Sequence, residues 1–85
     1  MAEIVATVEI SMYPLHENYL NLIQSFIDKL QDYTDLRTTT GPTSTVIIGE
    51  YERVMACVTQ ILRWSYEEHG PSVFVAKFLP GYDPE

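Results

Sequence analysis

Hydrophobic and polar side chains alternate along the first part of the chain, between Glu3 and Tyr13. One face of this segment is entirely apolar: Ile4, Ala6, Val8, Ile10 and Met12. A period of two over this length is typical of a half-buried β-strand. The other face mixes Val5 and Tyr13 with polar residues, which predicts partial cover. Pro14 has no N–H to give to a sheet, so we expect the strand to end there.

From about His16 to Tyr33 the apolar residues recur every three or four positions, which predicts an amphipathic helix. Its apolar stripe is Tyr19, Leu22, Ile23, Phe26, Ile27, Leu30 and Tyr33. Two short β-branched segments, 36–40 and 44–48, then flank the turn signal Gly41-Pro42. This arrangement predicts a β-hairpin.

A second helix is predicted from Tyr51 to Glu68, because Gly70 and Pro71 form a strong stop signal after it. Its inner stripe is Val54, Met55, Val58, Ile61, Leu62 and Ser65. The last predicted strand runs from 72 to 79, and residues 80–85 form a tail. Periodicity alone leaves open whether Phe74, Ala76 and Phe78 or the alternate residues of this strand face the helices.

The predicted order is β-α-β-β-α-β, which indicates an α+β, ferredoxin-like sandwich. In that fold a four-stranded antiparallel sheet carries two helices on one face. Eighty-five residues fit one domain, 1–85, with no room for a second core. The opposite face of the sheet would be half apolar, which predicts self-association.

The charge balance excludes some classes of partner. The chain carries 12 acidic and 5 basic residues, for a net charge of −7. The basic residues are scattered, whereas nucleic-acid binding needs them clustered. No apolar run approaches the roughly 20 residues of a membrane span, and the start lacks the basic segment of a signal peptide. We therefore expect a cytoplasmic protein that binds neither nucleic acid nor membrane.

The sequence offers no recognisable catalytic set and no metal cluster. His16 and His69 fall at predicted helix ends. Cys57 lies in the middle of the second predicted helix, where we expect it to be a small buried hydrophobic residue and not a reactive thiol. The acidic and histidine residues at 67–69 are adjacent, so they do not converge on one helical face. Trp64 could stack on a ligand or seal the edge of the core.

Hydroxyl side chains gather in the predicted hairpin and at the end of the first strand. They are Ser11, Thr38, Thr40, Thr43, Ser44 and Thr45. One interpretation is structural, because Thr suits strands and Ser suits turns. The other is a binding site, because hydroxyls donate and accept and so suit a heteroaromatic ring with mixed edges.

Three segments carry a resemblance to a known family. They are Ser11-Met12-Tyr13-Pro14-Leu15, the threonine strand 36–40 followed by Ser44-Thr45-Val46, and the ending Phe78-Leu79-Pro80-Gly81-Tyr82-Asp83. In this order and spacing the chain resembles the YkoF-like thiamine- and hydroxymethylpyrimidine-binding family and its single-domain relatives. The resemblance spans about residues 5–83.

The resemblance implies a ferredoxin-like fold without catalysis or cofactor, and binding of thiamine or its hydroxymethylpyrimidine moiety in the cytoplasm. Its role would be that of a carrier, a scavenger or a regulatory subunit. The candidate ligand-binding residues are Ser11, Tyr13, Thr38, Thr40, Ser44 and Thr45. In this picture Tyr13 or Trp64 stacks on the ligand, and Glu9 or Glu50 faces the thiazolium cation.

YkoF joins two such domains in one chain, so a homodimer of this chain would restore the pair, and two dimers could form a tetramer. The sequence leaves open whether the site lies within one protomer or at an interface. The alternative function is a dimeric assembly or regulatory domain that associates through its sheet and binds no vitamin.

Overall fold

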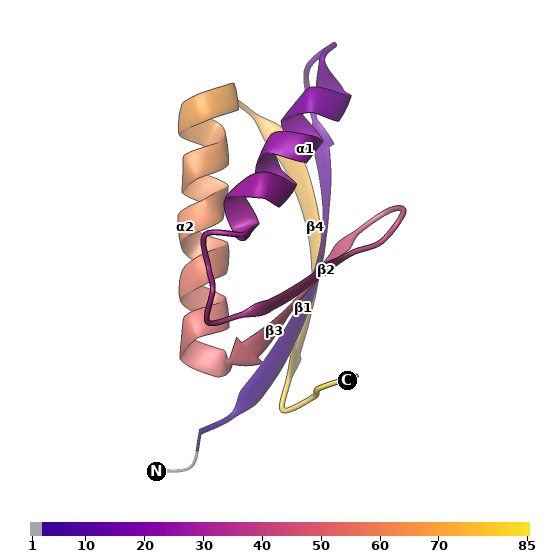
Figure 1. Ribbon diagram of the computed structural model, residues 1–85. Helices are drawn as coiled ribbons and strands as arrows, with labels where there is room; N and C mark the ends of the chain where they lie inside the picture. Colours follow the sequence, from indigo (N-terminus) through magenta and orange to yellow (C-terminus); the bar gives the residue numbers. More distant parts are fainter. Residues whose placement is uncertain (1–2) are drawn as a thin grey trace.

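The computed structural model describes residues 3–85 and has two helices packed on one side of a four-stranded sheet (Figure 1). The elements are β1 (Val5–Pro14), α1 (Tyr19–Leu30), β2 (Arg37–Thr40), β3 (Thr45–Glu50), α2 (Tyr51–His69) and β4 (Ser72–Pro80). The strand order is β2-β3-β1-β4, and every neighbouring pair is antiparallel. This confirms the predicted ferredoxin-like α+β fold. The expected domain range 1–85 includes residues 1–2, which lie outside the described part.

Helix α1 is shorter at both ends than the predicted range of about His16 to Tyr33. The backbone N–H of Asn18 donates to Nδ1 of His16 at 2.9 Å, so a turn precedes the helix, which begins at Tyr19. At the other end the N–H of Tyr33 donates to the carbonyl of Leu30 at 3.1 Å. This three-residue spacing tightens the chain into a turn, which ends the regular helix.

The core lies between the helices and the face of β1 that carries its even-numbered residues. Val8 and Ile10 are fully buried there, with Phe26 from α1 and Ile61 from α2. Each large apolar side chain buried in this way contributes about 1.5–3 kcal/mol. The ring of Phe26 also packs against that of Phe74, with centroids 5.5 Å apart.

The register of β4 settles the orientation that periodicity left open. Phe74, Ala76 and Phe78 lie opposite Met12, Ile10 and Val8 of β1. Directly opposite residues of an antiparallel pair share a face, so these three side chains are on the helix side. The alternate residues of β4 are therefore on the outer face of the sheet.

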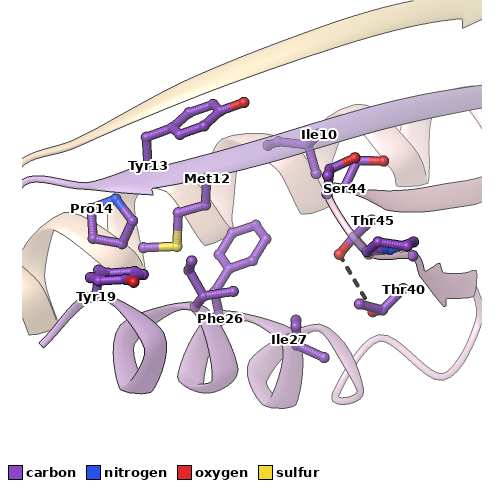
Figure 2. Close-up of a pocket in the computed structure, with 14 residues that line it drawn as sticks. Ile10, Met12, Tyr13, Pro14, Tyr19, Phe26, Ile27, Thr40, Ser44 and Thr45 are labelled. Carbon is purple, nitrogen blue, oxygen red and sulfur yellow. Dashed lines mark hydrogen bonds between the residues drawn. The ribbon is translucent and has the colours of Figure 1, made fainter.

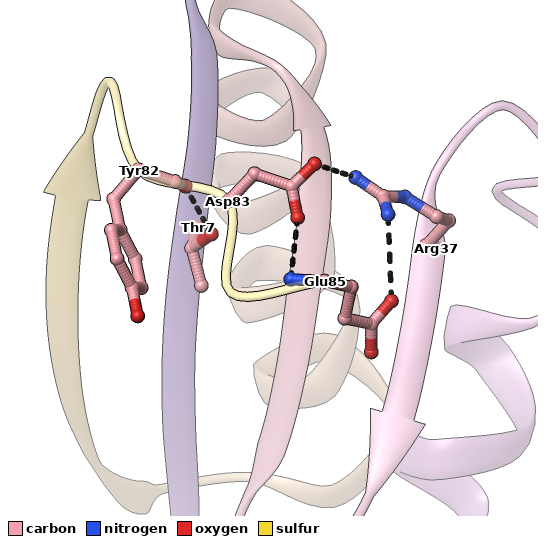
Figure 3. Close-up of polar contacts among 5 residues, drawn as sticks. All are labelled: Thr7, Arg37, Tyr82, Asp83 and Glu85. Atoms are coloured by element: carbon pink, nitrogen blue, oxygen red, sulfur yellow. Dashed lines mark hydrogen bonds and ion pairs between the residues drawn. The ribbon is translucent and has the colours of Figure 1, made fainter.

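The chain after β4 turns back across the outer face of the sheet (Figure 3). The N–H of Gly81 donates to the carbonyl of Val5 at 2.7 Å, and the hydroxyl of Thr7 donates to the carbonyl of Tyr82. Gly81 has φ +84°, a conformation that glycine adopts without strain and that allows this reversal. The tail is thereby fixed to β1.

The tail ends at the other edge of the sheet, at Arg37 of β2. The Arg37 guanidinium bonds to Asp83 at 2.5 Å and to Glu85 at 3.4 Å (Figure 3). This pairing lowers the pKa of the Asp83 carboxyl, mainly through the hydrogen bond from Arg37. Ile48, which lies between Thr7 and Arg37 in the sheet, is only 1% exposed although it faces away from the helices.

The part of the outer face formed by β1 and β4 is exposed and mostly apolar. Tyr13 is 55% exposed and Val75 is 57% exposed, with Val73 beside them, and Leu79 lies farther along β4, opposite Thr7. Lys77 of β4 forms an ion pair with Glu9 in the same region, at 3.3 Å. The outer face thus has a half crossed by the tail and an apolar half.

Candidate functional site

A pocket of about 390 Å³ lies between α1, the end of β1 and the loop that joins β2 to β3 (Figure 2). Its floor and walls are mainly apolar side chains from the sheet and from one face of α1. These side chains are Ile10, Met12, Ile23, Phe26 and Ile27. The volume suits a small ligand of one or two rings.

The two ends of the pocket differ in chemistry. Pro14 and Tyr19 lie at the end where β1 passes into α1, and Thr40 and Thr45 lie at the end formed by the hairpin (Figure 2). Residues 41–44 complete the hairpin wall. A ligand would therefore meet an aromatic ring at one end, an apolar middle, and hydroxyl groups at the other end.

The hydroxyl end follows from the strand register. Thr45 lies opposite Ile10 of β1 and opposite Thr40 of β2, so both threonines face the helix side. Thr45 is only 5% exposed, and its hydroxyl is 3.4 Å from that of Thr40. A contact this long is a weak hydrogen bond, which leaves both hydroxyls with capacity to bond a ligand.

The wall formed by the hairpin loop is held from the outer face of the sheet. The hydroxyl of Ser11 donates to the carbonyl of Thr43 at 3.0 Å, and the hydroxyl of Ser44 donates to Oε2 of Glu9 at 3.0 Å. The Ser44 hydrogen bond, helped by Lys77, lowers the pKa of the Glu9 carboxyl. These contacts fix the loop relative to β1.

Four of the six residues predicted to bind ligand line the pocket: Tyr13, Thr40, Ser44 and Thr45. The ring of Tyr13 lies on the other side of β1 from Phe26 and α1 (Figure 2). Ser11 and Thr38 are not part of the lining. Thr38 instead accepts a hydrogen bond from Gln31 at 3.3 Å, just beyond the end of α1.

Tyr19 and the apolar lining residues were not predicted to be parts of a site. These residues belong to stripes that predict a core, and periodicity does not distinguish a side chain that fills the core from one that borders a cavity. The one available signal is the place of Tyr19, five residues after Pro14, where a strand end and a helix start meet.

Two other residues considered for the site lie elsewhere. Trp64 packs against the core from α2, where its ring makes an edge contact with His69 at 5.5 Å between centroids. Lys29 lies 5.7 Å from the same ring. Glu50 caps α2 by accepting the N–H of Glu52 at 2.7 Å, and it is absent from the pocket lining.

No Asp, Glu, His, Lys or Arg side chain lines the pocket. All fourteen lining residues are uncharged. Outside it, His69 contacts the hydroxyl of Ser25 at 3.2 Å, with no carboxylate bonded to its ring among residues 3–85. Within the same residues no three His, Cys, Asp or Glu side chains could hold a metal ion, and no helix is long and apolar enough to span a membrane.

The fold and the pocket together define a ferredoxin-like domain with an uncharged cavity that is apolar in the middle and rich in hydroxyls at one end. A family model described as "Thiamine-binding protein" matches residues 8–76. The match covers most of the chain, and the protein belongs to this family of thiamine-binding proteins. No curated protein matches the sequence.

Several solved structures share the fold. A candidate thiamine biosynthesis or salvage protein from Thermotoga maritima has a TM-score of 0.80 and 23% identity over 93% of this chain and 84% of its own. A protein from Streptococcus pneumoniae has a TM-score of 0.79 and 21% identity, over 87% and 83% of the two chains. A hypothetical protein from Methanocaldococcus jannaschii has a TM-score of 0.74 and 22% identity, over 100% and 87%.

Proposed function

We propose that this chain forms a single domain that binds thiamine or its hydroxymethylpyrimidine moiety without transforming it. It would act in the cytoplasm as a carrier, a scavenger or a regulatory subunit. The observation that carries the proposal is the pocket between α1 and the sheet, with hydroxyls at one end, in a chain of the thiamine-binding family. The lining of the pocket also includes no Asp, Glu, His or Lys side chain that could act as an acid or base or activate one of its hydroxyls.

The two ends of the pocket suggest how the ligand lies. Thr40, Thr45 and the 41–44 loop would hydrogen-bond the aminopyrimidine, whose edge carries both donors and acceptors. Tyr19 would face the thiazolium ring, since aromatic faces attract cations. Tyr13 would border the pocket through its backbone, because its ring lies on the other side of β1 (Figure 2).

The remaining predicted residues would act through the walls of the pocket. Ser11 and Ser44 would hold the hairpin loop in place through their hydrogen bonds to Thr43 and Glu9. Thr38 would support the wall through Gln31, which follows α1. We therefore propose all six as site residues, with direct side-chain contact expected from Thr40 and Thr45, which face the pocket.

A thermal-shift titration with thiamine and hydroxymethylpyrimidine tests the binding proposal. At a ligand concentration of 100 times Kd, binding to the folded state alone adds about 2.7 kcal/mol to the free energy of unfolding. For a domain of this size the melting temperature would rise by roughly 10 °C or more. No shift with either compound at millimolar concentration would contradict the proposal.

A second candidate function, assembly through the sheet, is favoured by the apolar half of the outer face. Tyr13, Val73 and Val75 form an exposed patch there, away from the part of the face that the tail crosses. We propose that a second copy of the chain covers this patch and forms a homodimer, which could pair again into a tetramer. A twofold arrangement would bring the same patch of both copies together.

Sedimentation velocity of the protein and of Val75→Lys tests the assembly. We expect the variant to be monomeric, because each interface would bury two unpaired ammonium groups. Leu20→Lys is the control, since Leu20 is exposed on α1, away from the sheet. A dimer that survives Val75→Lys, or a monomeric wild type, would contradict assembly through this patch.

A further inference from the structure

We infer that the pocket selects unphosphorylated thiamine or pyrimidine over the corresponding phosphate esters. This inference rests on the proposed function and adds to it the chemical form of the ligand. It follows from where the charges of the chain lie relative to the pocket.

The lining of the pocket offers nothing to neutralise a phosphate group. Its polar groups are hydroxyls and backbone, and none of its residues is Lys, Arg or His. Proteins that hold phosphates use charge-assisted hydrogen bonds from Arg or Lys, which are much stronger than neutral ones. The N-terminus of α1 at Tyr19 attracts anions, but the pocket lining adds no Lys, Arg or His beside it.

The basic side chains are all engaged with carboxylates elsewhere. The pairs are Lys29 with Asp32, Arg37 with Asp83 and Glu85, Arg53 with Asp35, Arg63 with Glu67, and Lys77 with Glu9. The five residues are the complete set of Lys and Arg in the sequence. Recruiting one to a phosphate would break an existing ion pair.

The overall charge acts in the same direction. With a net charge of −7, the chain repels an anionic ester and attracts a thiazolium cation. The aromatic end of the pocket adds to this preference, because the face of Tyr19 is attractive to a cation. Thiamine without phosphate carries that cation and no compensating anion.

Calorimetric titration with thiamine, thiamine monophosphate and thiamine diphosphate at physiological salt tests the inference. We expect the monophosphate to bind at least about tenfold more weakly than thiamine, and the diphosphate more weakly still, because unpaired like charges oppose binding. Phosphate esters that bind as tightly as thiamine would overturn the inference while leaving the proposed function intact. Absence of binding by all three, and by hydroxymethylpyrimidine in the same assay, would overturn both.

A charge placed at the pocket gives a second readout. Tyr19→Lys puts an ammonium group at the aromatic end, and we expect it to reduce the preference for thiamine over the diphosphate by at least about tenfold. Tyr66→Lys is the matched control, because Tyr66 is exposed on α2 outside the pocket and its replacement changes the net charge equally. An unchanged preference in Tyr19→Lys, or the same change in both variants, would contradict selection at this site.

Discussion

Two buried threonines of the sheet allow ligand binding to be separated from folding stability. Thr45 faces the pocket and is 5% exposed, whereas Thr7 faces the tail and is 3% exposed. Replacing either by Val removes one hydroxyl and keeps the shape of a β-branched side chain. The two substitutions are therefore closely matched in chemistry and in burial, and they differ in what the hydroxyl contacts.

For Thr45→Val we expect little change in the free energy of unfolding, within about 0.5 kcal/mol. The lost contact is the 3.4 Å one with Thr40, whose own side chain is exposed enough to bond water instead. Thiamine should lose one hydrogen bond, worth about 0.5–1.5 kcal/mol. Its Kd should accordingly rise about two- to tenfold.

For Thr7→Val we expect the opposite pattern. The hydroxyl donates to the carbonyl of Tyr82, so its loss leaves a poorly paired acceptor and should cost about 1 kcal/mol of stability. The melting temperature should then fall by about 4–8 °C. Thiamine affinity should be unchanged, because Thr7 is on the opposite face of the sheet from the pocket.

Urea unfolding and calorimetric titration of both variants provide the two measurements. The reasoning is refuted if Thr45→Val binds thiamine as the wild type does. It is equally refuted if the two variants lose the same stability and the same affinity, since the hydroxyl of Thr45 would then serve the fold.

Three further predictions concern other parts of the molecule. Burial raises the pKa of the Cys57 thiol to about 11, which leaves little of the reactive thiolate at pH 8. A small alkylating reagent should therefore modify the native protein at least about a hundredfold more slowly than the unfolded chain at this pH, as followed by mass spectrometry. Arg37 lowers the pKa of Asp83 below its ordinary 3.8. The ion pair therefore stabilises the folded state fully above that pH, and its contribution is lost as the pH falls through the lowered pKa. Melting temperatures measured from pH 6 to pH 2 should fall less steeply in Asp83→Asn than in the wild type. Gly49→Ala would place Cβ 2.5 Å from Cδ2 of the buried Leu36, which should cost about 1–3 kcal/mol in urea unfolding, whereas no loss would mean that Leu36 has room to move.

The element order and the antiparallel sheet could be predicted because each element carries its own periodicity. The alternation in β1 distinguishes its two faces, and the glycine and proline after α2 mark where that helix stops. The ends of α1 could not be predicted from its stripe. They depend on local hydrogen bonds, such as that between Asn18 and His16.

The site was harder to predict, because it depends on register between strands. Ser44 and Thr45 are adjacent in the sequence, yet their hydroxyls lie on opposite faces, one on Glu9 and the other in the pocket. The sequence places hydroxyls in the hairpin but does not tell which of them faces α1. Tyr19 was not predicted as a site residue, because a residue that borders a cavity has the same periodicity as one that fills the core.

The most direct test of the account is a ¹H–¹⁵N NMR titration of the protein with thiamine, which reports binding and its location together. The account predicts saturable shifts concentrated at residues 10–14, 19–27 and 40–45, around the pocket between α1 and the sheet. An absence of shifts at millimolar thiamine would contradict the binding claim. Saturable shifts confined to the outer face of β4 or to the start of α2 would contradict the assigned site.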